Sequence, residues 1–116
     1  SETTFEEDTA DKRRVMEAFD SLIADAHART VSQNMLFRTV GIKVRFEDFS
    51  TFTRARTHGC YTNEKKVMEG YVKALFRDFE SSRKKIRLVG VRVANLMKAD
   101  VEQESILSWA RAVPNE

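Results

Sequence analysis

Apolar residues recur along the chain at two spacings, and each spacing predicts a different kind of element. The three- and four-residue intervals of an amphipathic helix appear in residues 12–28 and again in residues 67–79. Strand-forming residues or strict alternation appear in four other segments, residues 1–5, 39–47, 51–58 and 86–96. The pattern therefore predicts the element order β-α-β-β-α-β.

Alternation also predicts which side chains point to the core. In residues 39–47, Val40, Ile42, Val44 and Phe46 lie on one face, and Thr39, Gly41, Lys43, Arg45 and Glu47 lie on the other. In residues 86–96, the valines at 89, 91 and 93 alternate with Leu88, Gly90, Arg92 and Ala94. The polar segment 47–50 is short enough to join residues 39–47 and 51–58 into a hairpin. Gly59 is expected to end the second strand of that hairpin.

This order fits an α+β fold of the ferredoxin-like type, a four-stranded, mostly antiparallel sheet with two helices on one face. The other face is then open and carries lysine, arginine, threonine and glycine. Such a face can lie against a sugar-phosphate backbone, because no bulky side chain keeps the main chain away. We expect residues 1–98 to form this domain and residues 99–116 to form a C-terminal tail.

Composition narrows the class of protein. A chain of 116 residues with 41% hydrophobic residues is expected to form one soluble domain, without a membrane span. The single Cys60 excludes an internal disulfide and fits a reducing, cytoplasmic compartment. The chain has only two histidines and one cysteine, and His27 lies far from His58 and Cys60 in sequence, so no metal site is expected.

The net charge of +2 is unevenly distributed. Residues 1–25 carry a formal charge of −5, whereas residues 83–98 carry +6. Such a polarity in a nearly neutral chain favours a polyanionic partner on one face. A solvated basic surface is the alternative.

Three blocks of sequence resemble one known family. They are SETTF at residues 1–5, TVGIKVRFEDFSTFTRARTH at residues 39–58 and IRLVGVRVANL at residues 86–96. In this order and spacing they resemble the little finger domain of Y-family translesion DNA polymerases of the DNA polymerase IV type. The resemblance implies a DNA-binding module that lies in the major groove of the primer–template and grips both backbones through its sheet.

The resemblance also implies what this chain lacks. The parent would be an error-prone, DNA-directed DNA polymerase acting in DNA repair, with palm-domain carboxylates that bind Mg²⁺ for phosphoryl transfer. Those carboxylates belong to another domain, so no catalytic residue, metal site or cofactor is expected in this chain. The expected state is a monomer with no membrane association.

Site residues follow from the matching motifs. The segment Thr53-Arg54-Ala55-Arg56-Thr57 matches the family's T-R-x-R-T strand, whose amides, hydroxyls and guanidinium groups bind phosphates. Ser1, Arg87 and Arg92 match residues that bind the DNA backbone, and Lys43 and Arg45 lie on the polar side of the neighbouring strand. Leu88 departs from the pattern, because some relatives carry a basic residue there.

An alternative applies to the two arginines of the T-R-x-R-T strand. Arg54 and Arg56 alternate in phase with Phe52, so they could point to the helix side and lie around the rim of the core. In that case Thr51, Thr53, Ala55 and Thr57 would face DNA.

The tail carries a second motif. Gln103, Ile106 and Trp109 form a degenerate match to the peptides that bind a sliding clamp, either PCNA or the bacterial clamp. The alternative is that Ile106 and Trp109 pack on the domain itself.

Three other functions compete with DNA binding. An RNA-binding sheet of this topology needs exposed aromatic residues on its central strands, whereas threonine, lysine, arginine and glycine are expected there. A small metabolic enzyme needs a phosphate loop, paired carboxylates or a Ser-His set, and the sequence shows none. A protein-interaction module remains the third, with the tail as its main contact.

Overall fold

The computed structural model describes residues 1–99. The elements are β1 (Glu2–Thr9), α1 (Lys12–Ser32), β2 (Met35–Phe46), β3 (Thr51–Thr62), α2 (Lys65–Phe76), a short 3-10 helix (Arg77–Phe79), β4 (Ile86–Ala94) and β5 (Met97–Lys98). The predicted order is confirmed. Gly59 does not end the second hairpin strand, because β3 continues to Thr62.

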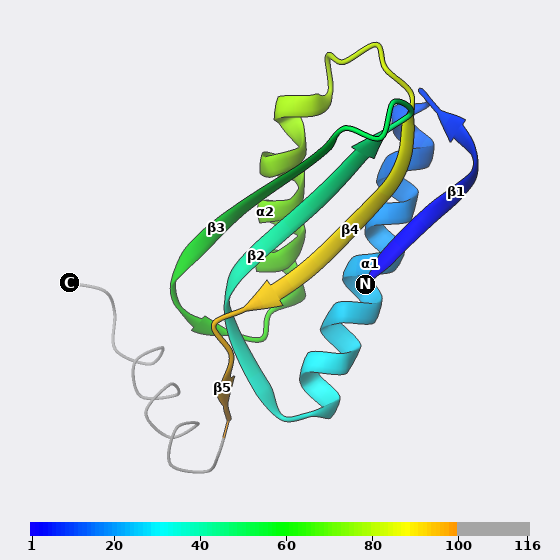
Figure 1. The fold of residues 1–116 in the computed structure, drawn as a ribbon. Coiled ribbons are helices and arrows are strands. Elements are labelled where there is room, and N and C mark those ends of the chain that lie inside the picture. The colour runs from blue at the N-terminus through cyan, green and yellow to red at the C-terminus, as the bar shows by residue number, and fades with distance from the viewer. Residues whose placement is uncertain (100–116) are drawn as a thin grey trace.

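The strands form one antiparallel sheet in the order β1-β4-β2-β3, and β5 pairs with the start of β2. Both helices lie on the same face of this sheet (Figure 1). The predicted α+β class, with two helices on one face of an antiparallel sheet, is therefore confirmed. In a ferredoxin-like sheet β1 and β3 are the two central strands, whereas β2 and β4 are central here. The order β1-β4-β2-β3 is therefore the ferredoxin-like order with the direction of the chain reversed.

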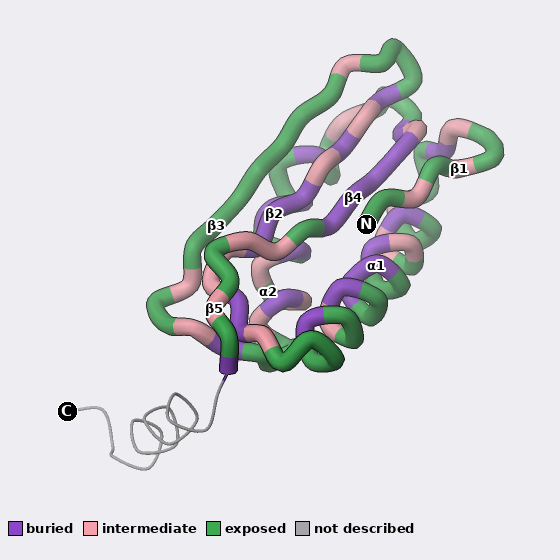
Figure 2. The backbone as a smooth tube through the Cα atoms, turned by 60° about the horizontal axis from the view of Figure 1, so that its bottom comes forward, coloured by how far each residue is buried: buried purple, intermediate pink, exposed green. Residues whose placement is uncertain are grey.

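The core lies between the sheet and the helices (Figure 2). Phe19 of α1 and Phe76 of α2 are fully buried, and their rings meet edge to face at a centroid distance of 5.2 Å. The Asp11 carboxylate accepts hydrogen bonds from the amides of Arg13 and Arg14 and caps the start of α1. These contacts hold the helix layer against one face and leave the other to solvent.

The hairpin between β2 and β3 is tied to the segment before β4. Lys84 donates to the carboxylate of Asp48 at 2.8 Å, and the Ser50 amide donates to the same carboxylate. The hydrogen bonds from Lys84 and Ser50 hold the pKa of Asp48 well below its usual range. The basic segment 83–85 is therefore anchored to one end of the sheet.

A β-bulge displaces the beginning of β4. Arg45 pairs with Leu88 and Phe46 pairs with Ile86, so Arg87 is an extra residue between two paired positions. Ile86 consequently points into the core beside Val89, although simple alternation would place it on the opposite face. The same bulge redirects the side chain of Arg87.

Candidate nucleic-acid interface

The face of the sheet away from the helices is built from alternate residues of four strands. Paired residues of antiparallel strands point to the same face, so the register assigns each position. We call this surface the open face; its residues are Glu2 and Thr4 of β1, Leu88, Gly90, Arg92 and Ala94 of β4, Thr39, Gly41, Lys43 and Arg45 of β2, and Thr51, Thr53, Ala55 and Thr57 of β3. The open face carries three basic side chains, five threonines and two glycines, and it carries no aromatic side chain.

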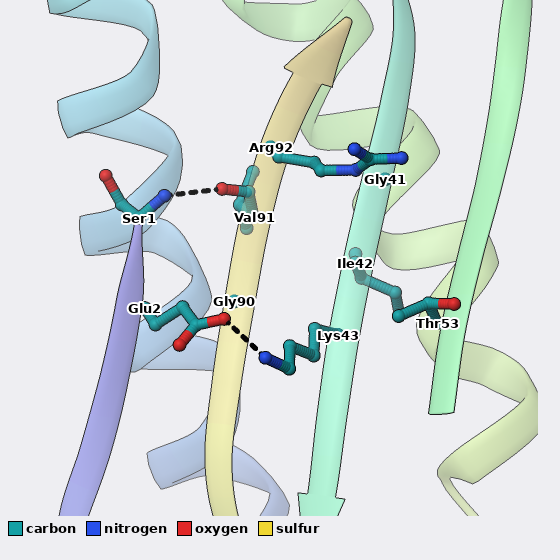
Figure 3. A pocket seen from close by; sticks show the side chains of 9 residues that line it. All are labelled: Ser1, Glu2, Gly41, Ile42, Lys43, Thr53, Gly90, Val91 and Arg92. Atoms are coloured by element: carbon teal, nitrogen blue, oxygen red, sulfur yellow. Dashed lines mark hydrogen bonds and ion pairs between the residues drawn. The ribbon is translucent and has the colours of Figure 1, made fainter. Parts of the chain in front are cut away.

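Two glycines hollow out the centre of this face. Gly41 of β2 and Gly90 of β4 lie on neighbouring strands, and both line a shallow depression of about 280 Å³. Ser1, Lys43, Thr53 and Arg92 lie around it (Figure 3). Both glycines are buried, because the side chain of Arg92 covers Gly41 and that of Glu2 covers Gly90, and cationic and hydroxyl groups form the rim around them.

Arg92 spans this hollow. A Cβ atom placed on Gly41 would lie 3.5 Å from both Cγ and Nε of Arg92, so the arginine side chain lies directly over the glycine (Figure 3). Arg92 is exposed, and no ion pair with an acidic residue is found for it within residues 1–99. Its guanidinium group is thus available to an external anion.

Lys43 has an acidic neighbour on the same face. Its Nζ lies 2.9 Å from Oε2 of Glu2, and the pair reaches across Gly90 of β4 (Figure 3). The hydrogen bond from Lys43 lowers the pKa of the Glu2 carboxyl, so the carboxylate is charged at neutral pH. Glu2 was not among the predicted site residues, because only the register of β1 against β4 places it on the open face.

The remaining threonines and Arg45 form a polar row along β2 and β3. Arg45 Nε donates to Thr51 Oγ1 at 2.9 Å, and the hydroxyls of Thr39 and Thr57 are 3.1 Å apart. Thr53 lies opposite Lys43, and Ala55 lies opposite Gly41. Thr39 and Thr51 extend the predicted set of Thr53, Ala55 and Thr57. Alternation within β2 already indicated Thr39, and alternation within β3 indicated Thr51.

Of the two orientations left open for Arg54 and Arg56, the structure shows the one on the helix side, and DNA contact by either arginine stays a prediction. Arg54 pairs with Ile42 and Arg56 pairs with Val40, both core positions, so the two arginines point to the helix side of β3. The Arg54 guanidinium lies 5.2 Å from the ring of Phe79 and 3.6 Å from the carboxylate of Asp78. Strict alternation from Phe52 explains the placement, as the alternative had stated.

Two further predicted residues lie at the border of the open face. Arg87 stacks on the ring of Phe49 at 4.5 Å and lies 3.7 Å from Asp8, at the end of the sheet that carries the β2–β3 hairpin. The Ser1 hydroxyl accepts a hydrogen bond from Arg29 of α1 at 2.8 Å. The structure therefore brings Ser1, Lys43, Thr53 and Arg92 together and leaves Arg87 apart from them.

The described part of the chain shows neither a cluster of metal ligands nor a helix that could span a membrane. Within residues 1–99 no group of three or more His, Cys, Asp or Glu residues is placed to hold a metal ion. The carboxylates there do not fit a two-metal centre for Mg²⁺. None of the described helices is long and apolar enough to cross a membrane. Gln103, Ile106 and Trp109 lie outside the described residues.

The sequence model of the impB/mucB/samB family C-terminal domain matches residues 1–106. The chain belongs to this family. The match covers all of the open face, and it confirms the resemblance to the little finger domain of DNA polymerase IV on which the choice of site residues rested.

The sequence relatives agree with this assignment. The chain is 41% identical over 106 residues to DNA polymerase IV 2 of Methanosarcina mazei and 34% identical over 105 residues to DNA polymerase IV of Methanoculleus marisnigri. These matches cover 91% and 90% of the chain, which spans only 28% and 29% of the two relatives.

Among solved structures, the fold is similar to that in a complex of the β-clamp processivity factor and the little finger domain of PolIV. The TM-score is 0.66 at 21% identity, covering 81% of this chain and 84% of that one. It is also similar to part of a DinB family error-prone DNA polymerase from Sulfolobus solfataricus, with a TM-score of 0.68 at 14% identity, covering 84% of this chain and 28% of that one. These similarities support the fold.

Proposed function

We propose that this domain binds duplex DNA through the open face and holds the primer–template of an error-prone DNA polymerase. The observation that carries the proposal is the hollow at Gly41 and Gly90, rimmed by Lys43, Thr53 and Arg92. A phosphate entering this hollow would meet the charged and hydroxyl groups of the rim, and it would reach the main chain of the two glycines where Arg92 and Glu2 move aside. Membership in a family whose relatives are DNA polymerases supports the same function.

The proposed contacts are independent of base sequence. Lysine, arginine and threonine side chains recognise phosphates and sugars, and the open face carries no aromatic platform for stacking bases. Affinity should therefore fall steeply with salt, because each neutralised phosphate releases counterions. Non-specific duplex binding of this kind has a Kd of roughly 10⁻⁴ to 10⁻⁶ M at physiological salt.

Arg92→Ala tests the proposal. Arg92 is exposed and unpaired among the described residues, so its removal should weaken binding equally for unrelated duplexes. It should also lower by about one the salt slope, which is the slope of log affinity against log salt concentration. The melting temperature should change little, since a solvent-facing side chain contributes little to the core. Fluorescence anisotropy with two unrelated duplexes at several salt concentrations measures these effects.

Arg13→Ala is the matched control, since Arg13 lies exposed on α1 in the helix layer and its loss changes the net charge equally. Arg54→Ala then reports whether an arginine on the helix side of β3 also reaches DNA. A clear sequence preference, or binding without salt dependence, would contradict the proposal.

The catalytic step of the proposed parent polymerase lies elsewhere. Mg²⁺ would supply charge stabilisation for phosphoryl transfer in another domain. The proposed contribution of this chain is to bind the backbone and to orient the duplex relative to that domain.

We also propose that the tail binds a sliding clamp through Gln103, Ile106 and Trp109. One observation favours this second contact: a similar little finger domain of PolIV has been solved in complex with a β-clamp processivity factor.

Trp109 is the only tryptophan, so its fluorescence reports the contact directly. Adding a clamp should shift its emission to shorter wavelength, and Ile106→Ala should weaken the response. An emission that is already blue-shifted in the free chain and is unaffected by the clamp would instead indicate packing on the domain.

A further inference from the structure

The ion pair between Glu2 and Lys43 occupies the place where a phosphate would bind. Glu2 belongs to the first strand and Lys43 to the second, and β4 lies between them. The Glu2 side chain therefore has to pass over β4, and it does so at Gly90, where an added Cβ would lie only 3.1 Å from Glu2 Cγ. The carboxylate reaches Lys43 Nζ at 2.9 Å inside the hollow (Figure 3).

We infer that Glu2 is an internal competitor of DNA, a carboxylate that neutralises Lys43 in the free domain and must be displaced when a phosphate enters the hollow. This inference rests on the proposed function. Both groups are singly charged oxyanions that accept hydrogen bonds from an ammonium group, so they compete for the same donor. Until Glu2 is displaced, its charge also repels the incoming phosphate.

The exposure of the pair makes the exchange feasible. The side chains of Lys43 and Glu2 are 31% and 47% exposed, so water can solvate the carboxylate as it leaves. An ion pair with this much solvent contact is weak and yields readily to a second anion. Arg92 on the opposite rim carries no such partner among residues 1–99, so the two cations of the hollow are held differently.

Glu2 thereby becomes a residue that sets affinity and salt dependence. Domains with a neutral side chain at this position would hold duplex DNA more tightly and release it more slowly. With Glu2 in place, Lys43 contributes only the difference between its attraction to a phosphate and its attraction to the carboxylate.

The experiment compares Glu2→Gln with Glu17→Gln in the 116-residue chain. Glu17 lies exposed on α1 in the helix layer, so its variant changes the net charge equally without touching the open face. Glu2→Gln should bind a fluorescent duplex about two- to fivefold more tightly and steepen the salt slope by about one. The reason is that Lys43 then neutralises a DNA phosphate, which releases the counterion of that phosphate. Glu17→Gln should have a clearly smaller effect.

A double-mutant comparison isolates the pair. Lys43→Gln should reduce affinity less than twofold in the wild-type background, whereas in the Glu2→Gln background it should abolish the gain. Unchanged or weaker binding by Glu2→Gln would overturn the inference, the second result showing that Glu2 positions Lys43 for DNA. If the wild-type chain shows no salt-dependent duplex binding at all, the proposed function fails, which is a distinct result from an equal affinity of the wild type and Glu2→Gln.

Discussion

Gly41→Val is expected to reduce duplex affinity at least tenfold, equivalent to about 1.4 kcal/mol, without unfolding the domain. The Cβ of the new side chain would fit in ordinary contact, 3.4 Å from the Arg54 carbonyl oxygen and 3.5 Å from Arg92 Cγ. Its two methyl groups extend further and would displace Arg92 from its position over the hollow. They would also cover the main chain that a phosphate is proposed to approach.

Stability should not fall, because valine is favoured over glycine in a strand and restricts the unfolded chain. Gly70→Val provides the control, since Gly70 lies exposed on α2 and a Cβ there would meet no atom within 4 Å. Anisotropy titration gives the affinity, and a thermal melt confirms that both variants are folded. A folded Gly41→Val that retains wild-type affinity would show that DNA does not approach β2 at this point.

Phe76→Ala is expected to lower the free energy of unfolding by about 3–5 kcal/mol, the usual loss for a buried phenylalanine. The Phe76 ring is fully buried, with ring-centroid distances of 5.2 Å to Phe19 and 6.3 Å to Phe79. Its removal therefore leaves a cavity between α1, α2 and the 3-10 helix. Domains of this size have total stabilities of about 5–15 kcal/mol, so the variant should lose a large part of its stability.

Urea unfolding followed by circular dichroism measures this loss. Phe49→Ala is the matched control, because Phe49 is 62% exposed at the hairpin and touches the core little. We expect the control to lose about 1 kcal/mol or less, mainly through the contact of its ring with Arg87. A loss below 1 kcal/mol for Phe76→Ala would mean that the helix layer repacks around the missing ring.

Local pattern was sufficient for the elements and for most of the open face. Alternation in β2 places Val40 and Val44 in the core and Lys43 on the other side, because successive side chains of a strand point to opposite faces. The same rule places Arg92 on the open face of β4. These assignments depend only on neighbouring residues, so they could be made from the sequence.

Family motif and physical pattern disagreed at Arg54. The T-R-x-R-T match suggested a phosphate contact, whereas alternation from Phe52 sent the side chain toward Phe79 and Asp78. The structure follows alternation, because β3 pairs with β2 in a register that places Arg54 opposite Ile42. Local periodicity was the better guide to the direction of this side chain.

The sequence by itself determined the α+β class, the two apolar helix stripes and the basic, glycine-containing strands, because each of these follows from the spacing of residues within one segment. Only the tertiary structure decided the strand order, the bulge at Arg87 and the meeting of Glu2 with Lys43 over Gly90. These features depend on which segments become neighbours across the sheet. That choice is made by packing between residues far apart in the chain, and no local period encodes it.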